Sequence, residues 1–158
     1  MASGIPRQQA AAAALQRPVR VVAVGASAGG IEALHEFFRG LRPSSGEAYV
    51  LVLHLAADFK SELAEIVSRW TELPVVTLHE SQSLRADTVH VLARGLAASI
   101  TGHRIVVTPL SRREPVRHNI DDVFESLAGW QQAAAAIVLS GSGQAGCRGA
   151  GHVAAQGG

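Results

Sequence analysis

The stretch Gly25-Ala26-Ser27-Ala28-Gly29-Gly30 places a serine among glycines directly after an apolar run. Its first five residues match Gly-x-Ser-x-Gly, the pattern in which a tight turn between a strand and a helix presents a serine nucleophile. The first free N–H groups of the following helix can stabilise an oxyanion that develops beside this serine. Ser27 alone is equally compatible with a structural turn in which the hydroxyl caps the helix.

His54 is the candidate general base, because it ends a second apolar run at 49–54. The carboxyl ends of adjacent parallel strands lie at one edge of a sheet, so Ser27 and His54 are expected on neighbouring loops. An imidazole there can take the proton of the serine hydroxyl. The alternative is a strand-end histidine that is hydrogen-bonded to backbone. A serine followed directly by the histidine also differs from the chain order of α/β-hydrolases.

Other chemistries fit this chain less well. A dinucleotide-binding loop that starts at Gly25 needs a glycine where Ser27 stands, and it needs an acidic residue where the second strand ends in His54. The remaining histidines share no metal-ligand spacing, and the single cysteine, Cys147, is expected to be a small packing residue. We therefore expect neither a metal nor a cofactor, since acyl transfer needs only a nucleophile, a base and oxyanion donors.

The composition predicts one soluble, cytoplasmic domain. The chain has 158 residues, 47% of them hydrophobic, and a net charge of +1 without blocks of like charge, which argues against nucleic-acid binding. No apolar run reaches the roughly 18 residues of a membrane span, and the N-terminus lacks the apolar core of a signal peptide. Residues 1–18 are expected to form a linker or disordered tail.

The elements that position Ser27 and His54 alternate between strand and helix patterns. Strands are expected over 19–24, 49–54, 74–78 and 135–139, helices over 31–41, 59–70 and 123–130, and a β-hairpin within 88–108 that turns at 101–104. Asn119 or Asp121 can cap the last of these helices. The predicted fold class is α/β, with a doubly wound, mainly parallel sheet that is Rossmann-like in its layering but binds no dinucleotide.

Several segments together resemble the chemotaxis-receptor methylesterase (CheB-type) family. They are residues 25–34, 54–55 with 60–65, 117–128 and 137–143. The resemblance covers about 19–158 and is closest to the form fused to a receptor methyltransferase. It implies a methylesterase-like catalytic domain over 19–158 whose C-terminal part is missing, because a further strand and helix are expected after the glycines at 157–158.

The resemblance also implies an activity and its residues. Members of this family hydrolyse glutamate methyl esters on the cytoplasmic helices of bacterial chemoreceptors, releasing methanol during chemotactic adaptation. Ser27 corresponds to the nucleophile and His54 to the base. An oxyanion or substrate loop is expected from Ala28 and Gly29 and from Ser142 and Gly143. The implied partners are methylated chemoreceptors and a fused or associated receptor methyltransferase, with no nucleic acid and no membrane insertion.

The acid of the family's Ser-His-Asp triad is missing at its expected position, which Ala145 occupies, and no carboxylate follows Glu125 in the chain. In serine proteases, loss of the orienting aspartate costs about 10⁴ in kcat. Gln144 is neutral and one position away, and Asp121 is expected to be a helix cap. The alternative function is therefore a catalytically impaired binding or regulatory module that lacks the triad aspartate.

Overall fold

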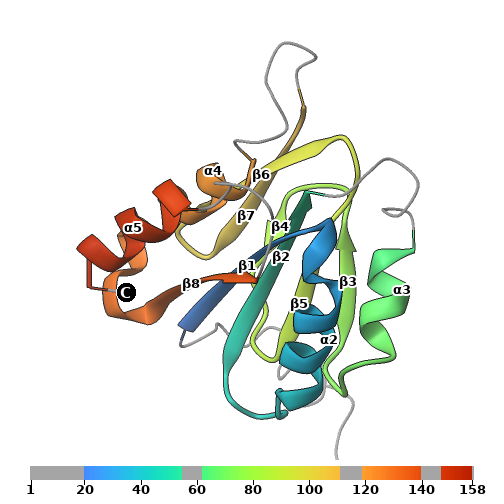
Figure 1. The fold of residues 1–158 in the computed structure, drawn as a ribbon. Helices are drawn as coiled ribbons and strands as arrows, with labels where there is room; N and C mark the ends of the chain where they lie inside the picture. The colour runs from blue at the N-terminus through green and yellow to red at the C-terminus, as the bar shows by residue number, and fades with distance from the viewer. Residues whose placement is uncertain (1–19, 55–61, 111–118, 140–146, 158) are drawn as a thin grey trace, which may run out of the picture.

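The computed structural model describes residues 20–54, 62–110, 119–139 and 147–157 (Figure 1). The predicted tail at 1–18 lies outside these ranges. A five-stranded parallel sheet has the strand order β3-β5-β2-β1-β8. Its strands are β1 (Arg20–Ser27), β2 (Glu47–His54), β3 (Val75–Leu78), β5 (Thr88–Leu92) and β8 (Ala134–Leu139). The predicted parallel sheet is therefore confirmed.

Strand β1 is an inner strand of this sheet, since it pairs with β2 on one side and with β8 on the other. Its side chains alternate between two buried clusters: Val21 and Ala23 belong to one, and Val22 and Val24 to the other. A strand buried on both faces explains the nearly continuous apolar run that the sequence shows here.

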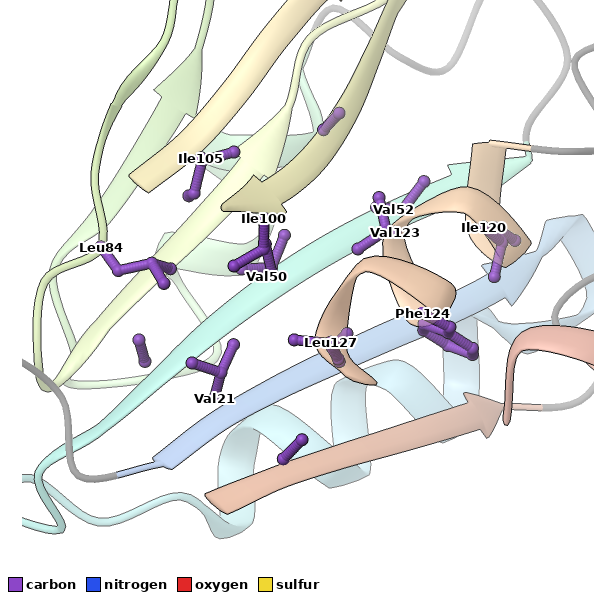
Figure 2. Packing of buried hydrophobic residues seen from close by; sticks show 14 of the residues in the cluster. Val21, Val50, Val52, Leu84, Ile100, Ile105, Ile120, Val123, Phe124 and Leu127 are labelled. Atoms are coloured by element: carbon purple, nitrogen blue, oxygen red, sulfur yellow. The ribbon is translucent and has the colours of Figure 1, made fainter. Parts of the chain in front are cut away.

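Helices cover both faces of the parallel sheet, as a doubly wound fold requires (Figure 1). On one face lie α2 (Ile31–Gly40) and α3 (Leu63–Ser68), which bury Leu34, Phe38 and Val67. On the other lie α4 (Asn119–Ser126) and α5 (Cys147–Ala155). Figure 2 shows Phe124 of α4, and Leu127 directly after this helix, packed over β1 in the cluster that contains Val21 and Ala23.

The hairpin forms where it was predicted but belongs to a second sheet. Strands β6 (Leu96–Thr101) and β7 (Arg104–Pro109) turn at Gly102, whose φ of 55° suits glycine. The two-residue strand β4 (Gln82–Ser83) completes an antiparallel sheet in the order β4-β7-β6. Strand β5 lies in the same range, 88–108, but is not part of the hairpin, since it pairs in parallel with β2 and β3.

Helix α4 joins the two sheets. The Asn119 side chain accepts a hydrogen bond from the Ala98 N–H (3.3 Å) and donates one to the Leu96 carbonyl (3.0 Å). The Ser126 hydroxyl oxygen accepts another from the Ile100 N–H (2.8 Å). These side chains provide hydrogen-bond partners for backbone groups on the outer edge of β6. Asn119 thus binds this strand, whereas the sequence predicted it as a possible helix cap.

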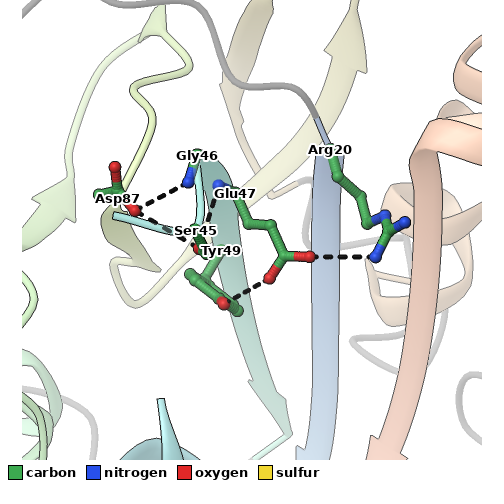
Figure 3. A network of polar contacts seen from close by, with 6 residues as sticks. All are labelled: Arg20, Ser45, Gly46, Glu47, Tyr49 and Asp87. Carbon is green, nitrogen blue, oxygen red and sulfur yellow. Dashed lines mark hydrogen bonds and ion pairs between the residues drawn. The ribbon is translucent and has the colours of Figure 1, made fainter. Parts of the chain in front are cut away.

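Polar contacts align the amino ends of β1 and β2 (Figure 3). Arg20 donates to Glu47 at 3.1 Å, and the Tyr49 hydroxyl donates to the same carboxylate at 2.7 Å. Burial, reinforced by the Glu47 carboxylate, raises the pKa of Tyr49 to about 12, so this donor stays protonated. Asp87 accepts from the Gly46 N–H at 3.0 Å and holds the turn before β2.

The chain described after β8 ends in a regular helix terminus. Gly157 has φ of 91° and donates its N–H to the Ala154 carbonyl, a left-handed helix cap of the kind that glycine favours. Among the described helices, none combines the length and the apolar character that crossing a bilayer demands.

Candidate active site

Ser27 and His54 are the last residues of β1 and β2, and their Cα atoms are partners in the parallel register. Both strands run in the same direction, so the two residues lie at the carboxyl edge of the sheet. The structure thus brings together the predicted nucleophile and base. The side chain of His54 lies outside the described part of the structure.

The connections of β1 place Ser27 at the point where the order of the strands reverses. The chain leaves β1 through α2 and returns beside it as β2, whereas β8 arrives on the opposite side of β1, with Ala26 opposite Leu139. Ligands of open α/β sheets bind outside the carboxyl ends of the strands at such a switch point. The topology therefore selects the same edge as the residue pattern.

Ser27 stands where the strand turns directly into a helix. Its backbone is extended, with φ of −107° and ψ of 178°, and the 3-10 helix η1 (Ala28–Gly30) runs into α2. The Ser27 side chain is half-buried and makes no capping hydrogen bond to η1. Ser27 therefore does not cap the helix through its side chain. Its position between a strand and a helix is the one that a nucleophile elbow requires.

Gly25 lets helix α4 approach the sheet just before the serine. A Cβ atom at this position would lie 2.5 Å from Cγ2 of Ile120 and 3.2 Å from Cζ of Phe124. Both distances are shorter than ordinary van der Waals contact. The first glycine of the motif is thus required by packing between β1 and α4, beyond any requirement of the turn.

The remaining residues of the predicted loops are described unevenly. Gly29 is exposed, and a Cβ there would meet no described atom within 4 Å. Ala28 begins η1, and its N–H group belongs to the start of the helical segment. The predicted loop residues Ser142 and Gly143, and the acid position Ala145 with its neighbour Gln144, lie outside the described residues.

Asp121 is buried on the α4 side of the sheet. The residue is only 6% exposed. Its Oδ1 accepts a 2.7 Å hydrogen bond from the N–H of Gly149 in the first turn of α5. The predicted helix cap is therefore found at a different helix: Asp121 lies inside α4 and caps α5. The sequence offers no local signal for this contact, because it depends on how two distant helices pack.

Of the other histidines that the structure describes, three pack on aromatic rings or in the core, and His79 and His152 are exposed. His35 packs on Trp70 and His103 on Trp130, with ring centroids 5.0 and 4.9 Å apart. His90 is fully buried in β5, and burial lowers its pKa to about 4, so it is neutral. Within the described ranges, no three His, Cys, Asp or Glu side chains are grouped so that they could hold a metal ion.

A surface cavity of about 610 Å³ lies away from Ser27, at the C-terminal ends of α2 and α3. Arg39, Arg42, Arg69 and Trp70 contribute to its lining. Arg39 and Arg69 pair with glutamates one turn earlier on their own helices, so these charges are internally compensated. The carboxyl edge of the sheet, which carries Ser27 and His54, is therefore a better candidate for the active site than this cavity.

Comparisons with known proteins converge on one family. The family model described as CheB methylesterase matches residues 22–158. A protein-glutamate methylesterase/protein-glutamine glutaminase of Mesorhizobium japonicum is 34% identical over 145 residues, covering 87% of this chain and 41% of that protein. A similarly named protein of Burkholderia orbicola is 33% identical over 131 residues, covering 82% of this chain and 39% of that protein. The chain thus spans about two fifths of these relatives.

The fold has a solved counterpart. The crystal structure of the Thermotoga maritima CheB methylesterase catalytic domain superposes with a TM-score of 0.72 at 21% sequence identity. The match covers 88% of this chain and 76% of that one. At this identity the likeness concerns the fold, and it agrees with the parallel sheet and the antiparallel hairpin described above.

Proposed function

Because the chain belongs to the CheB methylesterase family, we propose that it hydrolyses glutamate methyl esters on chemoreceptor cytoplasmic helices, releasing methanol in chemotactic adaptation. The observation that carries this proposal is the register pairing of Ser27 with His54 at the switch point of the sheet. A hydroxyl and an imidazole on adjacent strand ends form the minimal pair for acyl transfer.

The proposed reaction has two steps. Ser27 Oγ attacks the ester carbonyl while His54 takes the hydroxyl proton, and the tetrahedral intermediate collapses as His54 returns this proton to the departing methanol. Water then attacks the acyl-enzyme with His54 again as base, which frees the glutamate carboxylate and restores Ser27. No cofactor or metal enters either step. The same route would release ammonia from a glutamine side chain, in keeping with the names of the relatives.

Backbone N–H groups are the proposed oxyanion donors. Ala28 and Gly29 follow the serine at the start of the helical segment, and N–H groups in a first helical turn are suited to bind a developing oxyanion. No described atom lies within 4 Å of a Cβ built on Gly29, which supports the approach of a substrate carbonyl at this point. Ser142 and Gly143 are proposed to complete the loop around the ester, since their segment follows β8, the neighbour of β1.

Further partners are part of the same proposal. A methylated receptor helix is the expected substrate, and a fused or associated receptor methyltransferase is the expected companion. We assign the site to the cytoplasm because chemoreceptor helices are modified there.

The direct test measures methanol release from methylated chemoreceptor by the purified wild-type chain and by Ser27→Ala. Ser83→Ala is the matched control, because Ser83 is an exposed serine of β4 in the second sheet. We expect turnover by wild type and by Ser83→Ala, and a loss of about 10³-fold or more in Ser27→Ala. Equal rates for the two variants would refute Ser27 as nucleophile.

A second readout separates an inactive site from an impaired one. A fluorophosphonate probe, which phosphonylates activated serines with loss of fluoride, should label wild type at Ser27 and leave Ser27→Ala unlabelled. Folded wild type that neither labels nor turns over would favour the alternative, a binding or regulatory module without esterase activity.

A further inference from the structure

Asp121 is the one buried carboxylate among the residues that the structure describes. Its Oδ1 accepts the Gly149 N–H at 2.7 Å, and Gly149 is the third residue of α5. The carboxylate therefore faces the first turn of α5, at the positive end of its dipole. A buried carboxylate needs a hydrogen-bond donor, and here the backbone of α5 supplies one.

The two helices hold this carboxylate in a fixed position. A Cβ on Gly149 would lie 2.6 Å from Cβ of Phe124 and 2.8 Å from the carbonyl oxygen of Asp121. The backbone of α5 thus rests directly on α4 at the residue that carries the charge. Such close packing leaves the Asp121 side chain little freedom to move away.

This charge lies on the same face and at the same edge of the sheet as the serine. Ile120, the residue before Asp121, contacts Gly25, which precedes Ser27 by two positions on β1. Residues two apart on a strand share a face. Position 54 has the same parity along β2 as Val50 and Val52, which pack in the cluster with α4. Figure 2 shows Ile120 beside the carboxyl ends of β1 and β2.

Apart from Arg148, which precedes Gly149 in the first turn of α5, and the half-buried Glu125 one turn further along α4, the charged groups on the described elements around α4 lie farther from this edge or are exposed. Arg20 and Glu47 start β1 and β2 and pair with each other at the amino edge. His152, near the end of α5, and Asp122, beside Asp121, are exposed. Strand β6 carries no ionisable side chain. Asp121 is thus the fixed charge best situated to act on the carboxyl edge.

We propose that Asp121 is the acidic positioning residue of this site, whose buried carboxylate stabilises the protonated form of His54 in place of the carboxylate missing at Ala145. The inference rests on the proposed function, in which His54 is the base. A nearby negative charge favours the imidazolium that forms when Ser27 loses its proton, and it orients the ring.

The test is an NMR titration of His54 in uniformly labelled protein, with His54→Gln used to assign the resonance. Asp121→Asn removes the charge and keeps an oxygen that accepts from Gly149, and Asp122→Asn is the matched control on the adjacent exposed residue. We expect the pKa of His54 to fall by about half a unit or more in Asp121→Asn and to stay unchanged in Asp122→Asn. No difference between the variants would overturn the proposal.

Activity provides a second, separable readout. Asp121→Asn should lower kcat for ester hydrolysis about 10-fold or more at unchanged melting temperature, and should move the acid limb of the pH–rate profile to lower pH. A purely structural residue would leave this limb in place. Absence of turnover with a shifted His54 pKa would reject the proposed function alone, and turnover without that shift would reject the function of Asp121 alone.

If Asp121→Asn does not fold, the pKa of His54 in the wild-type chain tests the proposal. A His54 pKa above that of an ordinary histidine supports a fixed negative charge beside the ring, and a pKa below it overturns the proposal. Asp121→Ala, which lacks both the charge and the acceptor, is expected to lower the melting temperature as well.

Discussion

Gly25 and Ile120 touch where β1 passes under the first turn of α4, and a methyl group on the glycine would lie 2.5 Å from the isoleucine Cγ2. The motif that presents Ser27 therefore also packs against the helix that carries Asp121. Changes in this contact should act on the stability of the whole carboxyl edge.

Gly25→Ala is expected to lower the free energy of unfolding by about 2 kcal/mol, because the added methyl group overpacks the interface of β1 with α4. Gly29→Ala, in the same motif but with no described atom near its Cβ, should change stability little. Urea denaturation measures both. In an Ile120→Ala background, the cost of Gly25→Ala should shrink, and an undiminished cost would show that the contact is not its cause.

Ala145→Asp is expected to raise kcat for ester hydrolysis by about 10- to 100-fold, by supplying a carboxylate at the family's acid position. The gain should stay well below the roughly 10⁴-fold effect of a triad aspartate in proteases, because Asp121 already supports the base. The gain must vanish in Ala145→Asp/Ser27→Ala. Measured methanol release tests both, and a gain close to 10⁴ would contradict the proposed function of Asp121.

His90 makes the fold sensitive to acid. Its Nε2 accepts from the Arg85 N–H, so the other ring nitrogen is the one that donates to the Tyr49 carbonyl, and the ring must be neutral. Burial lowers its pKa from 6.5 to about 4, so the unfolded chain binds this proton at higher pH than the folded chain does. The stability contributed by neutral His90 is thus complete above pH 6.5 and declines as pH falls towards 4.

The expected loss between pH 6.5 and pH 4 is about 3 kcal/mol, which follows from the difference between the two pKa values. Urea titrations across this range should show a shallower pH dependence in His90→Gln than in wild type. His79→Gln removes an exposed histidine and serves as control. Parallel curves for wild type and His90→Gln would exclude His90 as the source.

Gln131 carries backbone strain before β8. Its φ of 47° and ψ of −121° lie in a region that side chains disfavour and glycine tolerates. Gln131→Gly should therefore raise the free energy of unfolding by about 1 kcal/mol. Gln132→Gly, at the next exposed position, should instead lower it by a few tenths to 1 kcal/mol. Thermal melts of both variants check the sign, and stabilisation by both would contradict local strain at Gln131.

The parallel strands could be predicted where burial on both faces leaves a continuous apolar run, as in β1 and β2; β8 has such a run although its Val138 is exposed. Strand β5 was harder to recognise, because Thr88 and His90 are polar and yet buried. Because these polar residues alternate with valines, the sequence pattern is the one expected of a strand with one solvent-exposed face. Strand β4 has two residues and carries no periodicity that sequence could reveal.

The part of the candidate site that depends on strand ends could be predicted from the sequence, and the part that depends on helix packing could not. Ser27 and His54 each end a strand, and parallel topology alone brings strand ends together. The contact of Asp121 with Gly149 depends on the packing of two helices, for which neither residue has a local signature. Gly25 was recognisable as a turn glycine, but the helix that presses on it was not.

The inner position of β1 also has a consequence for the order in which the protein can form. Val21, from the start of the described chain, pairs with Ala134, close to its end. During synthesis, one edge of β1 therefore waits for β8 to leave the ribosome, and the contacts of Gly149 with α4 follow later still. Pairing across such a sequence separation slows folding and leaves an apolar edge open to other chains in the interval. The nascent chain should accordingly depend on chaperones more than its size suggests.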